Sequence, residues 1–164
     1  MSLFEQGAKL GDAPSSYLAG ESFLLGKGVA RDVAKGVAHL EKAAASDEPH
    51  ALDRLGDHYY KEKNYPKAVA AFEKARSLGW VPALANLGVI YVNGAGVPKD
   101  EKKAALLFKE GAEKGDKMAM LFYAQCVEGG VGVPPNRNEA VKWYRDAAAL
   151  GESRAAEWLK KNRL

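Results

Sequence analysis

The stretch ALANLGVIYVNGAGVPKD, residues 83–100, decides the fold, because its pattern recurs along the chain. Its glycine-rich end, GAGVPKD from Gly94, has counterparts in GKGVARD from Gly26 and GVGVPPN from Gly130. Gly94 and Gly130 are 36 residues apart, whereas Gly26 and Gly94 are 68 apart, which leaves room for one intervening unit. A fixed period of this length is the signature of a repeat protein.

A second set of columns keeps the same period and supplies the missing unit. The phrases LEKA, FEKA, FKEG and YRDA recur at spacings of 32, 36 and 36 residues, and they begin at Leu40, Phe72, Phe108 and Tyr144. The phrase FEQG at Phe4 extends this series by another 36 residues toward the N-terminus. A column of small residues stays in phase with them and consists of Gly20, Gly56, Gly88 and Ala124.

Each unit is predicted to contain two helices. Apolar residues recur at three- and four-residue steps in both halves of a unit, as in Leu52, Leu55 and Tyr59, and this spacing forms one face of a helix. We expect the small column to lie where the partner helix comes close, with the aromatic column filling the space that the small residues leave. The helices are expected near residues 13–25, 33–45, 49–61, 66–78, 81–93, 101–114, 117–128 and 138–150, with shorter ones at about 3–10 and 153–161. No stretch alternates as a strand would.

On these residues the chain resembles the Sel1-like repeat family, a relative of the tetratricopeptide repeat. Residues 83–100 match the pattern A-x-x-x-L-G-x-x-Y-x-x-G-x-G-V-x-x-D nearly position for position, and EAVKWYRDAAALGE (139–152) looks like the family's second helix. The unit at 49–79 lacks the GxGV loop and looks like a tetratricopeptide repeat instead. The resemblance implies an all-α, right-handed α-solenoid of antiparallel helix pairs, with about four units plus terminal capping helices. Because each pair needs its neighbours for stability, we predict a single Sel1-like repeat domain over residues 1–164.

Composition disfavours several classes of protein. The 24 Lys and Arg against 21 Asp and Glu leave a net charge of only +3, without the dense basic cluster of a nucleic-acid binder. The apolar stretches fall far short of the roughly 20 residues that span a membrane. Glu5 and Asp12 interrupt the region where a signal peptide needs an apolar core, and a single Cys fits a reducing compartment. We therefore expect a cytoplasmic protein that neither binds nucleic acid nor inserts into a membrane.

No catalytic residue, metal site or cofactor is expected. The segment LLGKGV around Lys27 lacks the G-x-x-x-x-G-K-[ST] spacing of a phosphate-binding loop. We interpret the loop glycines, Gly96 and Gly132 among them, as turn residues with positive φ. None of the three histidines has another His or a Cys four residues away, and Cys126 is interpreted as a partly buried structural thiol.

The candidate partner-binding site is the concave groove that the resemblance implies along the first helices. Transferring the register of tetratricopeptide units gives Tyr17, Glu21, His50, Asp53, Asp57, Tyr60, Asn86, Val89, Asn93, Met118, Leu121, Gln125 and Glu128. This set is apolar and acidic, and Lys61 is the only cation expected to oppose its acids, while most of the lysines are expected on the outward second helices. We hypothesise an acidic groove on a net-basic chain; the alternative is that these acids only keep the surface solvated.

The function favoured by this pattern is a non-catalytic protein–protein interaction module, the role that members of the family mostly have. Tyr17, Tyr60, Val89 and Leu121 would serve as apolar anchors for a protein or peptide. The acids would favour a partner with basic residues. The alternative is a dedicated cytosolic immunity or inhibitor protein that neutralises a cognate toxin or enzyme. An enzyme with an unrecognised site in the groove is the third reading.

Overall fold

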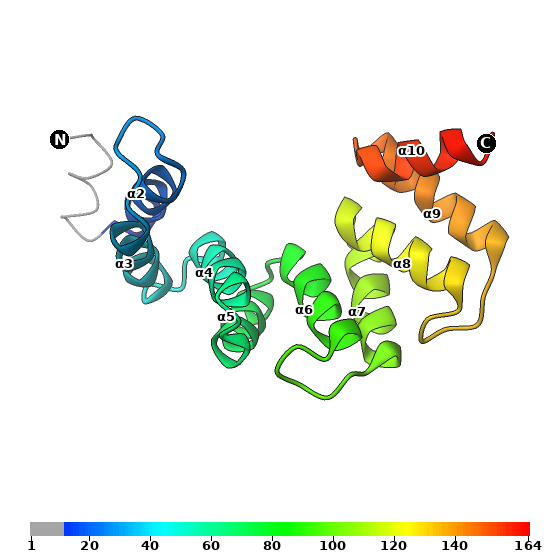
Figure 1. Cartoon of the computed structure of the whole chain (residues 1–164), viewed down its shortest axis with the longest axis horizontal. Coiled ribbons are helices and arrows are strands. Elements are labelled where there is room, and N and C mark those ends of the chain that lie inside the picture. The colour runs from blue at the N-terminus through cyan, green and yellow to red at the C-terminus, as the bar shows by residue number, and fades with distance from the viewer. Residues whose placement is uncertain (1–11) are drawn as a thin grey trace. The chain divides into compact units, whose positions relative to one another are not determined.

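In a computed structural model of the chain, residues 12–164 are described, and every regular element in that range is an α-helix (Figure 1). The helices are α2 (Ala13–Leu25), α3 (Val33–Ala44), α4 (Pro49–Lys61), α5 (Tyr65–Ser77), α6 (Pro82–Asn93), α7 (Glu101–Glu113), α8 (Lys117–Gly129), α9 (Arg137–Ala149) and α10 (Ser153–Lys161). Each lies within one residue, at either end, of the range predicted from the sequence, so the all-α prediction is confirmed. The helix expected at 3–10 lies outside the described residues.

Consecutive helices pack as pairs: α2 with α3, α4 with α5, α6 with α7, and α8 with α9. In each pair the first helix carries the small column and the second carries the Leu40, Phe72, Phe108 and Tyr144 column. The chain divides into two compact units, unit 1 (Met1–Trp80) and unit 2 (Val81–Leu164). Within unit 1, α3 also packs on α4; within unit 2, α7 packs on α8 and α10 packs on α9. The extent of the domain, residues 1–164, stays a prediction.

The small and aromatic columns meet as predicted. A methyl group placed on Gly56 would lie 2.5 Å from Cε1 of Phe72, and one on Gly88 would overlap the ring of Phe108. Phe72 and Phe108 are each only 2% exposed, so neither ring can swing out to make room at low cost. Glycine in the first helix thus sets how closely the second helix of the same pair approaches.

The loops between paired helices come in two lengths. Residues 26–32, 94–100 and 130–136 connect three of the pairs, whereas only residues 62–64 connect α4 to α5. In the long loops Gly96 and Gly132 both have φ of +71°, which confirms the prediction of positive φ. In the short loop Lys63 takes this conformation, with φ of +58°. The second repeat therefore reverses the chain without a GxGV sequence.

Candidate functional site

The predicted site residues all lie on the first helices of the pairs, α2, α4, α6 and α8. Twelve of the thirteen keep part of their surface exposed within the structure. The exception is Leu121, which is 1% exposed and belongs to the apolar core of unit 2 together with Ala85, its equivalent one repeat earlier. The prediction that Leu121 is an exposed anchor is therefore wrong. The positions equivalent to Leu121 in unit 1 are Asp53 and Tyr17, which are polar. The register taken from tetratricopeptide units therefore gave no sign that Leu121 is buried.

Two pockets occur at equivalent places in the two units. The first, of about 320 Å³, is lined by residues of α2 and α4, with Arg31 and Val33 beside them. The second, of about 360 Å³, is lined by residues of α6, α7 and α8, with Val131 beside them. The repeat spacings of 36 and 32 residues relate Glu21 and Asp57 in the first pocket to Val89 and Gln125 in the second. We call these two sites the polar pocket and the apolar pocket.

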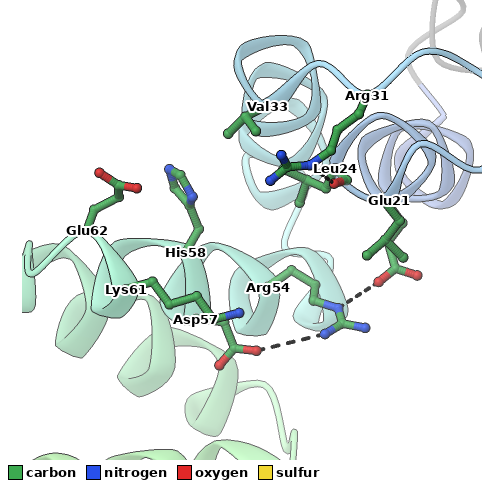
Figure 2. Close-up of a pocket in the computed structure, with 10 residues that line it drawn as sticks. Glu21, Leu24, Arg31, Val33, Arg54, Asp57, His58, Lys61 and Glu62 are labelled. Atoms are coloured by element: carbon green, nitrogen blue, oxygen red, sulfur yellow. Dashed lines mark hydrogen bonds and ion pairs between the residues drawn. The ribbon is translucent and has the colours of Figure 1, made fainter.

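An arginine organises the polar pocket. Arg54 lies between two carboxylates (Figure 2): its Nε is 2.6 Å from Oε1 of Glu21, and its Nη1 is 3.8 Å from Oδ2 of Asp57. Burial raises the pKa of the Asp57 carboxyl, while the nearby charges of Lys61 and Arg54 act to lower it. The expectation that Lys61 is the only cation here is wrong. Arg54 was not selected, although it lies 32 residues before the predicted Asn86 and so in the same column, and its side chain reaches both acids.

The charges of the polar pocket are balanced in sign. Its charged lining consists of three acids and three bases: Glu21, Asp57, Glu62, Arg31, Arg54 and Lys61. Arg31 is anchored to the preceding helix, since its Nε donates to the carbonyl oxygen of Leu24 at 3.1 Å. The excess of acid expected from the sequence is therefore absent from this pocket.

An aromatic cluster lies beside these charges in unit 1. The exposed ring of His50 is 5.5 Å from the ring of Tyr17 and 4.2 Å from that of Trp80, measured between centroids. The Nδ1 atom of His50 is 2.6 Å from Oε1 of Glu48, which precedes it at the start of α4. These contacts bring together two of the predicted residues, Tyr17 and His50, and add Trp80, which was not among the predicted residues.

The apolar pocket has an uncharged lining. Val89, Val92 and Phe122 contribute apolar surface, and the Phe122 ring packs 5.1 Å from the buried ring of Phe108. Gln125 is exposed and lines the same pocket. Cys126 also lines it and is 5% exposed, and burial raises the pKa of its thiol to about 11. At neutral pH the thiol therefore carries no charge, in keeping with the structural role predicted for it.

Glu128 makes its contacts inside unit 2. Its Oε2 accepts a hydrogen bond from the hydroxyl of Tyr144 at 2.8 Å, and its Oε1 accepts one from Nε1 of Trp158 at 3.2 Å. The rings of Tyr144 and Trp158 are stacked with centroids 3.9 Å apart. The predicted binding carboxylate thus ties α8 to α9 and α10. Burial, followed by this hydrogen bond, raises the pKa of the Tyr144 hydroxyl.

Two residues beside the apolar pocket were missed and could have been found from the period. Phe122 lies 36 residues after the predicted Asn86, and Arg154 lies 36 after the predicted Met118. The guanidinium carbon of Arg154 is 5.6 Å from the Phe122 ring centroid, and its Nη2 is 3.1 Å from Sδ of Met118. Continuing the first-helix columns into α10 would have identified Arg154.

Other kinds of site find no support in the described part of the chain. Across residues 12–164, no group of three or more His, Cys, Asp or Glu side chains is placed to hold a metal ion. Over that same range, each helix is too short or too polar to cross a membrane.

Comparison with known proteins identifies the family. The model of the Sel1 repeat matches residues 13–48, 49–80, 81–116 and 117–152. The chain belongs to the Sel1 repeat family. The match at 49–80 includes the repeat that we compared with a tetratricopeptide unit, so its short loop is a variation within the Sel1 series. Sel1 repeat proteins are generally protein–protein interaction modules and non-catalytic scaffolds.

Individual relatives agree with this membership. The Sel1 repeat protein of Oxalobacter formigenes is 31% identical with a TM-score of 0.90, covering 93% of this chain and 62% of that one. The protective antigen c5321 of uropathogenic Escherichia coli, which has an SLR fold, is 27% identical with a TM-score of 0.88, covering 98% of this chain and 36% of that one. These likenesses confirm the solenoid fold class.

A curated relative carries a binding function in its name. The rat DAP3-binding cell death enhancer 1 is 30% identical over 165 residues, which cover 97% of this chain. The chain spans 32% of the length of that rat protein.

Proposed function

We propose that the chain is a non-catalytic module that binds a protein or peptide partner through the exposed faces of its first helices. The observation that carries the proposal is that each unit has a pocket at the equivalent repeat position, polar in unit 1 and apolar in unit 2, lined by predicted site residues of that unit's first helices. A repeat array that presents the same positions with different chemistry can recognise a partner at several points.

The family supports this role. Sel1 repeat proteins generally bind other proteins, and the rat relative is named for binding one. In this chain the half-exposed aromatic and apolar side chains of the first helices, such as Tyr17 and Val89, provide anchors that lose little conformational entropy on binding. Charged groups around the polar pocket would govern orientation and partner choice more than affinity.

The ion pairs of the polar pocket support a different proposal for the partner's charge from the one that the acids alone suggested. Because Arg54 pairs with both Glu21 and Asp57, the polar pocket offers fixed positive and negative groups side by side. We therefore propose a partner with both a basic and an acidic group at this point, in place of a uniformly basic one. The remaining predicted residues, Asp53, Tyr60, Asn86, Asn93 and Met118, are proposed as flanking contacts.

Affinity capture from a lysate of the source organism tests the function. Wild-type chain, Asp57→Lys and Glu73→Lys are immobilised in parallel, and the captured proteins are identified by mass spectrometry. Glu73 is a matched control, because it pairs with Arg76 at 3.7 Å as Asp57 pairs with Arg54 at 3.8 Å, each three residues apart, and it lies on second helix α5.

A protein retained by wild type and by Glu73→Lys but depleted on Asp57→Lys is the expected result. Several such proteins indicate an adaptor, and one stoichiometric protein indicates the inhibitor role. Capture that is lost on Glu73→Lys and kept on Asp57→Lys would place binding on the second helices and refute the proposal.

A further inference from the structure

We propose that the apolar pocket of unit 2 is a socket for one aliphatic side chain of an extended peptide segment, with an acidic residue of that peptide held beside it by Arg154. The proposal rests on the proposed function and specifies its ligand chemistry. The two pockets lie at equivalent positions of the repeat, but charged side chains line only the polar pocket. This difference indicates which kind of side chain the apolar pocket can bind.

The lining of the apolar pocket disfavours a charged side chain. Six charged side chains line the polar pocket, whereas residues such as Val89, Val92 and Phe122 line the apolar one. The ionisable group in its lining is the Cys126 thiol, which is neutral at pH 7 because burial raises its pKa. A buried charge without a partner is strongly disfavoured, whereas an aliphatic side chain gains from leaving water.

The rim of the apolar pocket favours a side chain carried on a peptide. At about 360 Å³ the pocket has room for an aliphatic side chain, and its volume lies within the roughly 300–1,000 Å³ of small-ligand sites, so the rim decides between the two. Gln125 is exposed at its edge, and a primary amide both donates and accepts hydrogen bonds. Its amide can therefore pair with the N–H and C=O groups of an extended backbone whose side chain enters the pocket.

A cation beside the socket selects the neighbouring residue of the peptide. The Arg154 guanidinium lies over the Phe122 ring at 5.6 Å and is oriented by Glu152, whose Oε1 is 3.0 Å from its Nε. Glu152 is 7% exposed, so it is positioned to hold Arg154 rather than to meet a partner. The Nη2 of Arg154 contacts Met118 Sδ, a weak acceptor that a carboxylate oxygen can replace, so the guanidinium can bind a carboxylate while its Nε stays paired with Glu152. An Asp or Glu next to the aliphatic residue therefore complements this rim.

Peptide display on the intact 164-residue chain provides the test. A random library is selected on wild type, and the enriched peptides are measured by titration against wild type, Gln125→Lys, Arg154→Met and Asn138→Lys. The Gln125→Lys change places a charge at the mouth of the socket. Asn138→Lys makes the same kind of change at an exposed position of α9. Melting temperatures verify that each variant is folded.

Binding of a side chain in the apolar pocket can also be followed at Cys126. Cys126 is the only thiol of the chain and lines the pocket, so a bound side chain should slow its modification by a small disulfide reagent. We expect enriched peptides to share an aliphatic residue adjacent to Asp or Glu and to slow Cys126 modification at least threefold. We expect Gln125→Lys to weaken their binding at least tenfold, Arg154→Met about threefold to tenfold, and Asn138→Lys less than twofold.

Three results would overturn the inference: no enriched peptide, an enriched motif without an aliphatic residue, or binding that leaves Cys126 modification and the Gln125→Lys titration unchanged. These outcomes are separable from failure of the proposed function. A protein captured through Asp57 but indifferent to Gln125→Lys would refute the socket and leave the interaction module standing.

Discussion

Replacing Gly88 by alanine tests the packing that holds the repeats in place. The new methyl group would overlap Cε1 of Phe108 and lie 2.7 Å from Cδ1 and Cζ, so the ring would have to move by more than about 1 Å to reach an ordinary carbon–carbon contact of about 3.5–4.0 Å. Phe108 is 2% exposed and packs against Phe122, which blocks that movement. Overpacking of this kind costs about 1–3 kcal/mol, partly offset by the roughly 1 kcal/mol that alanine gains over glycine in a helix.

The matched control is Gly129→Ala in the same unit. Gly129 ends α8 with ordinary φ, and an added methyl would meet only Val131 Cγ2, at 3.6 Å. We expect Gly88→Ala to be about 2 kcal/mol less stable than Gly129→Ala in urea unfolding, or about 4–8 °C lower in melting temperature for a chain of this size. In a Phe108→Leu background the cost of Gly88→Ala should shrink by at least about 1 kcal/mol, since the smaller side chain makes room. Equal stability of the two glycine variants, or no relief by Phe108→Leu, would refute this packing.

Three further predictions concern the loops, the buried thiol and the polar pocket. Gly132→Ala should lower the free energy of unfolding in urea by at least about 1 kcal/mol more than Gly28→Ala does. Both glycines have positive φ, but only a methyl group at Gly132 would overlap the backbone carbonyl of Glu101. Equal losses of stability would contradict this. Burial raises the pKa of the Cys126 thiol to about 11, whereas the unfolded chain releases this proton near the ordinary pKa of about 8.5. Between these pH values the folded state binds the proton more tightly than the unfolded state does. The free energy of unfolding should therefore be steady below about pH 8.5 and fall as pH rises toward 11. Urea midpoints from about pH 7 to 10.5 test this, and Cys126→Ala should reduce the dependence below about pH 10, leaving the fall at higher pH that comes from the buried tyrosines Tyr123 and Tyr144. Arg54→Met should raise the pKa of Asp57 further, as followed by NMR titration of its carboxyl carbon, whereas Arg76→Met should leave it unchanged.

The fold was predictable because its determinants are local and repeated. Gly88 and Phe108 recur with their equivalents at a fixed period, so helix pairs, loop glycines and helix bounds could be placed from the sequence. Lys63 shows the limit: its positive φ replaces the glycine turn, and no residue preference announces it.

The site was predictable only in part, because exposure and pairing depend on neighbouring helices. Val89 and Gln125 share the apolar pocket as the first-helix register implies. Leu121 has the register of a surface residue but is covered within unit 2. Arg54 lies 32 residues before the predicted Asn86, in the same column, and could have been selected. That its guanidinium pairs with Glu21 and Asp57 depends on side-chain reach, which the column does not show.

The most direct test of binding through the first helices is the dissociation constant of the captured partner for four single variants, measured by isothermal titration at low and moderate salt. Asp57→Lys and Gln125→Lys alter the polar and apolar pockets, whereas Glu73→Lys and Asn138→Lys make matched changes on α5 and α9. We predict that at least one pocket variant binds tenfold or more weakly, equivalent to about 1.4 kcal/mol or more, with both controls within about twofold of wild type. Weaker binding by the controls, with both pocket variants retaining wild-type affinity, would contradict the account.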